Sequence, residues 1–193
     1  MPTDRIELHN FSGGYCGISK VDLDAYCMCY LVNSIQLNNA QNDIKKMEEN
    51  VLFKNPFLKK HFTQAEFLFK EPLVISNVTF RKKSTYRNGI FLLGDAAGSV
   101  TPLCGNGMSM ALRASHIFAQ LLASFSKGNI SKEVFIRTYQ NAWEQQFDTR
   151  IMIGYYLQGL FGKKNLTDMS LKVLHQFPSI TKKIIQQTHG NPF

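Results

Sequence analysis

The stretch from Ile90 to Ala114 holds the residues best placed to do chemistry. Its apolar start predicts a short strand that ends at Gly94, where the missing side chain lets a ligand or another backbone come close. Asp95 follows at once, and a carboxylate there can accept hydrogen bonds from the hydroxyls of a sugar-like ligand. Further along, the turn at Gly105–Met108 begins an expected helix, whose free N–H groups would stabilise an anion or an electron-rich oxygen.

An aspartate for a polyol and a helix N-terminus for a delocalised negative charge suit a reduced flavin. The N1/C2=O edge of the flavin ring becomes anionic on reduction, and its ribityl chain carries hydroxyl groups. A glycine-rich turn into a helix can also serve packing alone, so that alternative stays open.

The string GDAAGSVTPLCGNGMSMAL resembles the second flavin motif of the flavoprotein hydroxylase superfamily typified by p-hydroxybenzoate hydroxylase. Its P-L-x-G-x-G spacing is most similar to the geranylgeranyl reductase branch. The resemblance implies that Asp95 binds the ribityl chain of FAD, that Pro102 lies near the isoalloxazine ring, and that backbone amides of the following turn contact its pyrimidine edge. The FAD-binding residues so implied are Gly94, Asp95, Pro102, Gly105, Asn106, Gly107 and Met108.

The upstream text GGYCGISKVDLDAYCMCYLV resembles the substrate-domain sheet of the same superfamily, in which a Gly-Gly-Tyr segment borders the substrate pocket. By this resemblance Tyr15 is the candidate substrate contact. The reductase pattern Tyr-x-Trp-x-Phe-Pro is not kept, because Gly17 takes the Trp place and Ser19-Lys20 stand for Phe-Pro. The resemblance therefore implies an apolar or aromatic small molecule and does not single out a prenyl chain.

The superfamily fold starts with a βαβ unit whose G-x-G-x-x-G glycines hold the FAD pyrophosphate, and this sequence has no such fingerprint. We therefore expect the carboxyl-terminal half of a flavoprotein, truncated naturally or otherwise, that binds FAD weakly or not at all by itself. A missing N-terminal half or a second copy of the chain is the expected partner.

The order of elements favours an α+β fold, because strand patterns come first and helical patterns last. Strands are expected at 5–11, 14–21, 25–32, Glu66–Phe69, Val74–Phe80 and 90–93. Helices are expected at 40–54, from Pro56 through PFLKKHF, at 106–126, at about 131–161, and as a pair within 166–189 divided by Pro178. With the resemblance, this predicts a substrate-domain antiparallel sheet with inserted helices in 1–86, the second flavin motif in 87–127, and the C-terminal helices of an incomplete FAD-binding fold in 128–193.

Composition narrows the class of protein further. The chain has 193 residues and a formal charge of +8, but its basic residues are scattered and accompany no nucleic-acid-binding signature, so we expect a solvated surface and no nucleic-acid partner. No apolar run could span a membrane and no signal peptide is evident. We expect a cytoplasmic protein, with peripheral binding to an acidic membrane as an alternative.

Neither the cysteines nor the histidines show metal-ligand spacing, so no metal site is predicted. The four cysteines, Cys16, Cys27, Cys29 and Cys104, are expected to be buried free thiols. Aromatic residues of the late helices are expected to form core: Tyr139, Trp143, Phe147, Tyr155, Tyr156 and Phe161.

The expected function is that of a fragment of an FAD-dependent oxidoreductase. Its full-length parent would be an NAD(P)H-linked reductase or monooxygenase, and no catalytic side chain is assigned because the flavin carries the chemistry. The alternative is a non-enzymatic small-molecule binding module derived from a flavoprotein.

Overall fold

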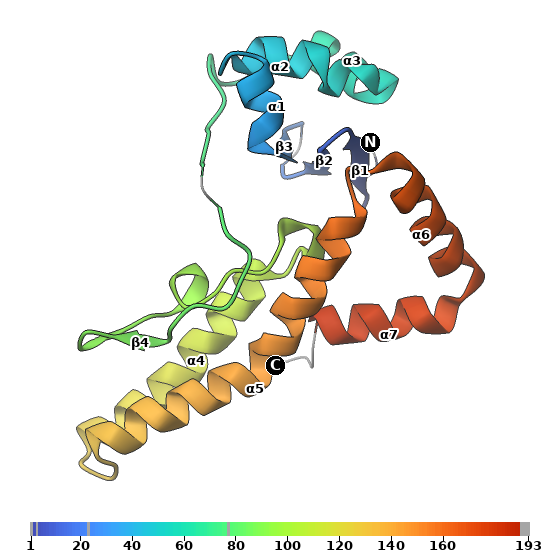
Figure 1. Ribbon diagram of the computed structural model, residues 1–193. Coiled ribbons are helices and arrows are strands. Elements are labelled where there is room, and N and C mark those ends of the chain that lie inside the picture. The colour runs from blue at the N-terminus through green and yellow to red at the C-terminus, as the bar shows by residue number, and fades with distance from the viewer. Residues whose placement is uncertain (1, 3, 23, 77, 190–193) are drawn as a thin grey trace. The chain divides into compact units, whose positions relative to one another are not determined.

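The computed structural model describes residues 2, 4–22, 24–76 and 78–189 and divides into two units (Figure 1). Unit 1 comprises Met1–Val74 and Gly159–Val173, and unit 2 comprises Ile75–Gln158 and Leu174–Phe193. An antiparallel sheet precedes a mostly helical part, so the predicted α+β class is confirmed. The division of the chain into functional segments 1–86, 87–127 and 128–193 stays a prediction.

The sheet of unit 1 is the predicted meander. Strands β1 (Ile6–Phe11), β2 (Gly14–Lys20) and β3 (Tyr26–Val32) pair antiparallel in that order. The register sets Phe11 against Gly14 and Gly14 against Val32. A side chain at position 14 would collide with the Leu31 carbonyl, 2.1 Å from the Cβ position, so this glycine lets β3 approach.

Short helices follow the sheet: α1 (Ser34–Asn39), α2 (Ile44–Asn50), the 3-10 turn η1 (Leu52–Lys54) and α3 (Pro56–Gln64). The helix predicted over 40–54 is found from Ile44 to Asn50 and continues as the 3-10 turn, but its first four residues are not helical. Gln41 and Asn42 both have positive φ, 60° and 62°, which interrupts a helix, and the Asp43 side chain then caps a new one by accepting from the Lys46 N–H. Pro56 does begin α3, as predicted.

The core of unit 1 lies on one face of the sheet. Phe11, Cys16 and Ile18 point to that face and meet buried residues of the helical segment, including Met47, Leu52 and Leu58. Alternate residues of a strand share a face. The alternation along β1 and β2 therefore decides which of their side chains α2 and α3 can cover.

The strands predicted at Glu66–Phe69 and Val74–Phe80 were wrong. Residues 66–76 and 78–80 form no strand, and Asn77 lies outside the described residues. Leu68 and Leu73 are 81% and 95% exposed. An apolar run needs a partner strand to supply hydrogen bonds, and these described residues have none.

Unit 2 starts with a hairpin of β4 (Tyr86–Arg87) and β5 (Ile90–Phe91) around Asn88 and Gly89, whose positive φ values suit a tight hairpin turn. The 3-10 turns η2 (Gly94–Ala96) and η3 (Pro102–Cys104) lead into α4 (Gly107–Ser126), and α5 (Lys132–Leu160) follows. The chain continues through α6 (Lys164–Gln176), most of which belongs to unit 1, and α7 (Pro178–His189) of unit 2. The pair of late helices divided by Pro178 is thus confirmed.

Aromatic residues fill the core between α4, α5 and β5. The rings of Phe91 and Phe135 stack 4.5 Å apart, and Phe118 meets Tyr139 edge-on at 5.3 Å. Of the late aromatic residues expected in the core, Tyr139, Trp143 and Phe147 are buried and Phe161 is partly buried, whereas Tyr155 and Tyr156 are 62% and 68% exposed. The latter two lie on the opposite face of α5, so that part of the prediction was wrong.

Within the described residues, no helix has the length and apolar character needed to cross a membrane.

Among the described glycines of unit 2, Gly98 is the one where packing leaves least room. A Cβ there would lie 2.7 Å from Cη2 of Trp143 and 3.2 Å from Cδ1 of Ile151. We expect Gly98→Ala to lower the free energy of unfolding by about 1–3 kcal/mol through overpacking. Urea denaturation followed by the fluorescence of Trp143, the single tryptophan, measures the change. Gly159→Ala in α5 is the control, because its Cβ would meet nothing within 4 Å, and equal losses for both variants would contradict the packing argument.

Candidate functional site

Residues 81–85 hold the predicted site segment from one side. The Lys83 N–H donates to the Ala97 carbonyl at 2.9 Å, and the Leu92 N–H donates to the Thr85 carbonyl at 2.8 Å. An isolated bridge between Lys82 and Gly98 continues the pairing. The segment Gly94–Ser99 is therefore fixed by backbone hydrogen bonds although it is not a regular strand.

Lys82 ties the same segment to α5. Its Nζ lies 2.9 Å from both Glu144 Oε1 and Asp148 Oδ2. The hydrogen bond to Asp148, followed by that to Glu144, raises the pKa of Lys82, and the bond from Lys82 lowers the pKa of Glu144. Because the three side chains are 34–42% exposed, solvent screens the ion pairs and their contribution to stability is small. The contact mainly sets the position of the segment.

Asp95 presents its carboxylate to solvent, beside Gly94. Gly94 has φ +53°, and a Cβ there would stand 3.4 Å from that of Ala111 on α4. Ser99 Oγ donates to Asp95 Oδ1 at 3.2 Å, and Lys83 Nζ donates to the Asp95 main-chain carbonyl at 3.0 Å. The backbone of Asp95 is thus anchored while its side chain stays exposed.

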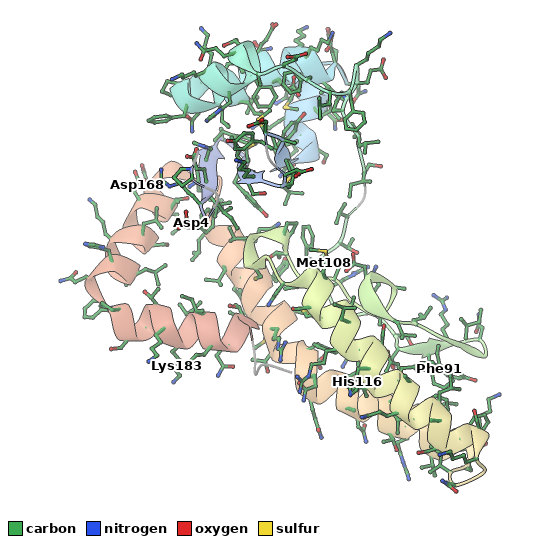
Figure 2. The ribbon with its side chains drawn as sticks, turned by 180° about the vertical axis from the view of Figure 1, so that it is seen from behind. Asp4, Phe91, Met108, His116, Asp168 and Lys183 are labelled. Carbon is green, nitrogen blue, oxygen red and sulfur yellow. The ribbon has the colours of Figure 1, made fainter. Side chains whose placement is uncertain are left out.

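The N-terminus of α4 lies next in this arrangement. Pro102 begins η3, and Gly105 ends it in the left-handed region at φ +68°. Asn106 occupies the N-cap position, and no described side chain caps the helix. The first turn therefore keeps backbone N–H groups that need an acceptor from outside the helix. Met108 in that turn is 83% exposed (Figure 2).

The Asn106 side chain is committed to the protein interior. It is buried, and its Nδ2 donates to the carbonyl of Thr188 on α7. Its Oδ1 has no hydrogen-bond partner among the residues described. Any contact of Asn106 with a ligand at the helix start must therefore come from its main chain.

The structure brings Gly94, Asp95 and Gly107 together around one small cavity. Its other lining residues are Gly98, Val100, Met110, Ala111, Ala114, Trp143 and Phe147. Its volume of about 10 Å³ suits no more than a single water molecule. Pro102, Gly105, Asn106 and Met108 lie on the same segment but outside this lining.

Sequence reasoning missed the residues that support the site. Ser99 and Lys83 bond to Asp95, and Trp143 closes the cavity from α5. Ser99 is close enough in sequence to have been a candidate partner. Lys83 and Trp143 are brought in by tertiary packing, and no spacing rule finds such partners.

Tyr15, the candidate substrate contact, belongs to unit 1. It is 5% exposed, and its ring meets that of Phe161 at a centroid distance of 6.2 Å. It alternates along β2 with Cys16 and Ile18, so it lies on the sheet face opposite the core of α2 and α3. Its role toward a substrate stays a prediction.

The cysteines divide into two kinds. Cys16 and Cys104 are buried, as expected, whereas Cys27 and Cys29 are exposed, which corrects the expectation for those two. Burial raises the pKa of Cys16 to about 12 and also raises the pKa of Cys104, a change that the hydrogen bond with Thr101 partly opposes. Cys104, a buried and protonated thiol just before α4, suits packing better than nucleophilic chemistry.

Comparisons with known proteins bear on what this arrangement is. The chain is 36% identical over 63 residues to digeranylgeranylglycerophospholipid reductase 1 of Methanopyrus kandleri, which covers 33% of this chain and 17% of the reductase. One third of the chain is thus similar to a short part of this reductase. No family model matches the chain. It is also 24% identical over 139 residues to conditioned medium factor receptor 1 of Dictyostelium discoideum, covering 69% of this chain and 26% of the receptor.

The fold has a counterpart of known structure. PqsL, a probable FAD-dependent monooxygenase from Pseudomonas aeruginosa, superposes with a TM-score of 0.56 at 15% identity, over 88% of this chain and 47% of PqsL. The chain thus has the fold of part of PqsL, and one third of its length is similar to part of the reductase. It spans about half the length of PqsL and about a sixth of the reductase that it matches.

Thiol reactivity tests the two kinds of cysteine. We expect iodoacetamide to alkylate Cys27 and Cys29 in the native protein, and Cys16 and Cys104 only after unfolding, because the thiolate is the reactive form and burial suppresses it. At about pH 9 the thiol of Cys16 should still be protected, since this pH lies well below its raised pKa. Peptide mapping by mass spectrometry identifies the modified positions. Rapid modification of Cys104 in the native state would show that the turn before α4 is accessible to the reagent and would contradict its burial.

Proposed function

We propose that this chain supplies the flavin-ring and substrate side of an FAD-dependent oxidoreductase that acts on an apolar or aromatic small molecule. The observation that carries the proposal is the meeting of Gly94, Asp95 and Gly107 at the uncapped N-terminus of α4. The partial similarity to the reductases and the fold shared with part of PqsL support it.

The donor set fits a flavin. The exposed Asp95 carboxylate would accept hydrogen bonds from ribityl hydroxyls, and the N–H groups of the Gly107–Ser109 turn would stabilise negative charge on the pyrimidine edge. Gly105, where nothing lies within 4 Å of the Cβ position, leaves its main chain open to a close approach. When bound, FAD would supply hydride or oxygen chemistry, with NAD(P)H as the proposed electron donor.

The small volume of the cavity decides which groups can make these contacts. A space for one water cannot enclose an isoalloxazine ring, so the exposed groups of Asp95, Gly105 and Met108 must provide the binding surface. Such a surface addresses the ring and the ribityl chain. The adenosine and pyrophosphate would be held elsewhere, by a further N-terminal half or by another copy of the chain.

A flavin titration tests the proposal. We expect the chain to quench the fluorescence of riboflavin and FAD with similar, weak affinity, because its contacts are with the part that the two ligands share. Asp95→Ala should weaken binding by about tenfold, the loss expected from one charge-assisted hydrogen bond. Asp95→Asn, which keeps an acceptor oxygen, should lose less.

Asp168→Ala is the matched control, because Asp168 is an exposed aspartate on α6 (Figure 2). Equal binding by the Asp95→Ala and unaltered chains would overturn the assignment of the ribityl site. It would favour a binding module that has lost flavin chemistry.

A further inference from the structure

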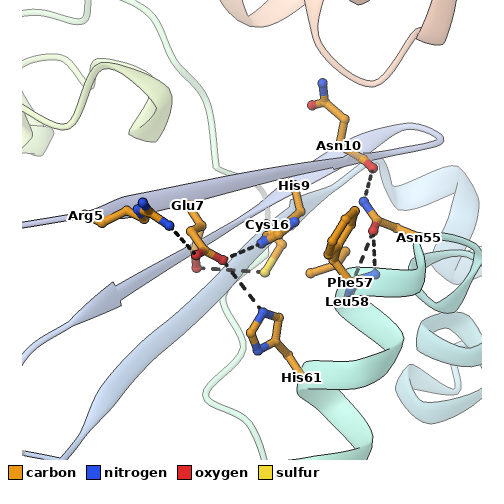
Figure 3. Close-up of polar contacts among 10 residues, drawn as sticks. Arg5, Glu7, His9, Asn10, Cys16, Asn55, Phe57, Leu58 and His61 are labelled. Atoms are coloured by element: carbon orange, nitrogen blue, oxygen red, sulfur yellow. Dashed lines mark hydrogen bonds and ion pairs between the residues drawn. The ribbon is translucent and has the colours of Figure 1, made fainter. Parts of the chain in front are cut away.

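A cluster of Glu7, His9 and His61 lies in unit 1, apart in sequence from the candidate flavin site (Figure 3). Glu7 and His9 are two residues apart on β1, so their side chains share one face of the strand. His61 comes from the last turn of α3. Residue spacing does not predict a metal site here, because strand and helix are brought together only by the fold.

The packing of α3 on β1 sets the position of His61. The Asn55 side chain, which caps α3, also donates to the Asn10 carbonyl of β1 at 3.0 Å. The rings of Phe57 and His61, one turn apart on α3, lie 6.0 and 5.7 Å from the ring of His9. Helix and strand therefore hold the two imidazoles next to each other.

The three side chains converge on one carboxylate oxygen. Glu7 Oε2 lies 3.2 Å from His9 Nε2 and 3.7 Å from His61 Nε2, and the three ligand atoms are all within 4.8 Å of one another. A zinc ion about 2.1 Å from each ligand in a tetrahedron needs ligand atoms roughly 3.4 Å apart. The observed separations match this requirement after small side-chain movements. Arg5 approaches the other oxygen, Oε1, at 4.0 Å and leaves Oε2 to the imidazoles.

The three side chains differ in exposure, and this difference suits a metal ion with one coordination position open to water. The side chains of His9, Glu7 and His61 are 12%, 27% and 41% exposed. The strand ligands are thus held by their surroundings, while the side of His61 is reached by solvent. An ion can enter there, and a water can serve as the fourth ligand.

We propose that Glu7, His9 and His61 form a binding site for Zn²⁺ that joins β1 to the end of α3. Two imidazoles and one carboxylate are a donor set that zinc uses with a water in the fourth position. The bound ion would hold the last turn of α3 on the sheet. Because the folded arrangement binds the ion and the unfolded chain does not, binding would also raise the thermal stability of the protein.

The test is a metal titration of the full chain in a Cys27→Ser/Cys29→Ser background, since the two exposed thiols could bind zinc by themselves. We expect one Zn²⁺ per chain in calorimetry, a higher Tm with zinc, and the intense visible absorption of four-coordinate Co²⁺ when cobalt replaces it. His61→Ala and Glu7→Gln should each weaken zinc binding by at least about tenfold, since even partners outside the ligand shell are worth that much.

His116→Ala is the control, because His116 is an exposed histidine on α4 that bonds to Gln120 (Figure 2). It should leave the zinc affinity unchanged. His61 is partly exposed and Glu7→Gln is nearly isosteric, so circular dichroism should show both variants folded. Absence of stoichiometric binding, or a His61→Ala affinity equal to that of His116→Ala, would overturn the proposal.

Discussion

The packing of Trp143 against Gly98 is the constraint on which the candidate flavin site depends. The indole occupies the space where any side chain at position 98 would lie, with Cη2 2.7 Å from the Cβ position. The loop after β5 can therefore run directly over α5. This close approach sets Gly94 and Asp95 beside the start of α4, and Trp143 and Phe147 form the floor of the cavity that they share with Gly107. The aromatic residues thus act on the site through the backbone that they support.

Charge in unit 2 is used in two ways. In the basic cluster at 81–83, Lys82 is paired with Glu144 and Asp148, and Lys83 donates to the main chain of Asp95. These two lysines position the loop, which explains part of the basic composition without an anionic partner. The uncapped N-terminus of α4 adds positive potential for a ligand, and it lies beside an exposed carboxylate. A polyol next to an electron-rich ring edge matches that combination better than a nucleic-acid phosphate does.

Local rules predicted the features that depend on neighbouring residues. The meander, the Pro56 and Pro178 helix starts and the strand–turn–helix of the candidate flavin site all follow from side-chain alternation, helical spacing or turn residues. Errors arose where a longer-range condition decides the outcome. The apolar residues near Leu68 and Leu73 could not become strands without a partner, and Gln41 and Asn42 adopt a left-handed turn that spacing does not reveal. Trp143 and Lys83 belong to the site for the same long-range reason.

The cluster of Glu7, His9 and His61 extends this reasoning to unit 1, whose core is small. One face of its sheet is covered by short helices, and α3 rests on β1 through Leu58, the Asn55 cap and the tilted ring contacts of His9 with Phe57 and His61. Short helices gain little stability from their own hydrogen bonds and depend on such packing. An ion that joins the last turn of α3 to β1 would act at the end of the helix that the Asn55 cap does not reach. The ion would stabilise the sheet that carries Tyr15. Asp95 and α4 belong to unit 2 and rely on aromatic packing instead. The two sites can therefore be separated by experiment.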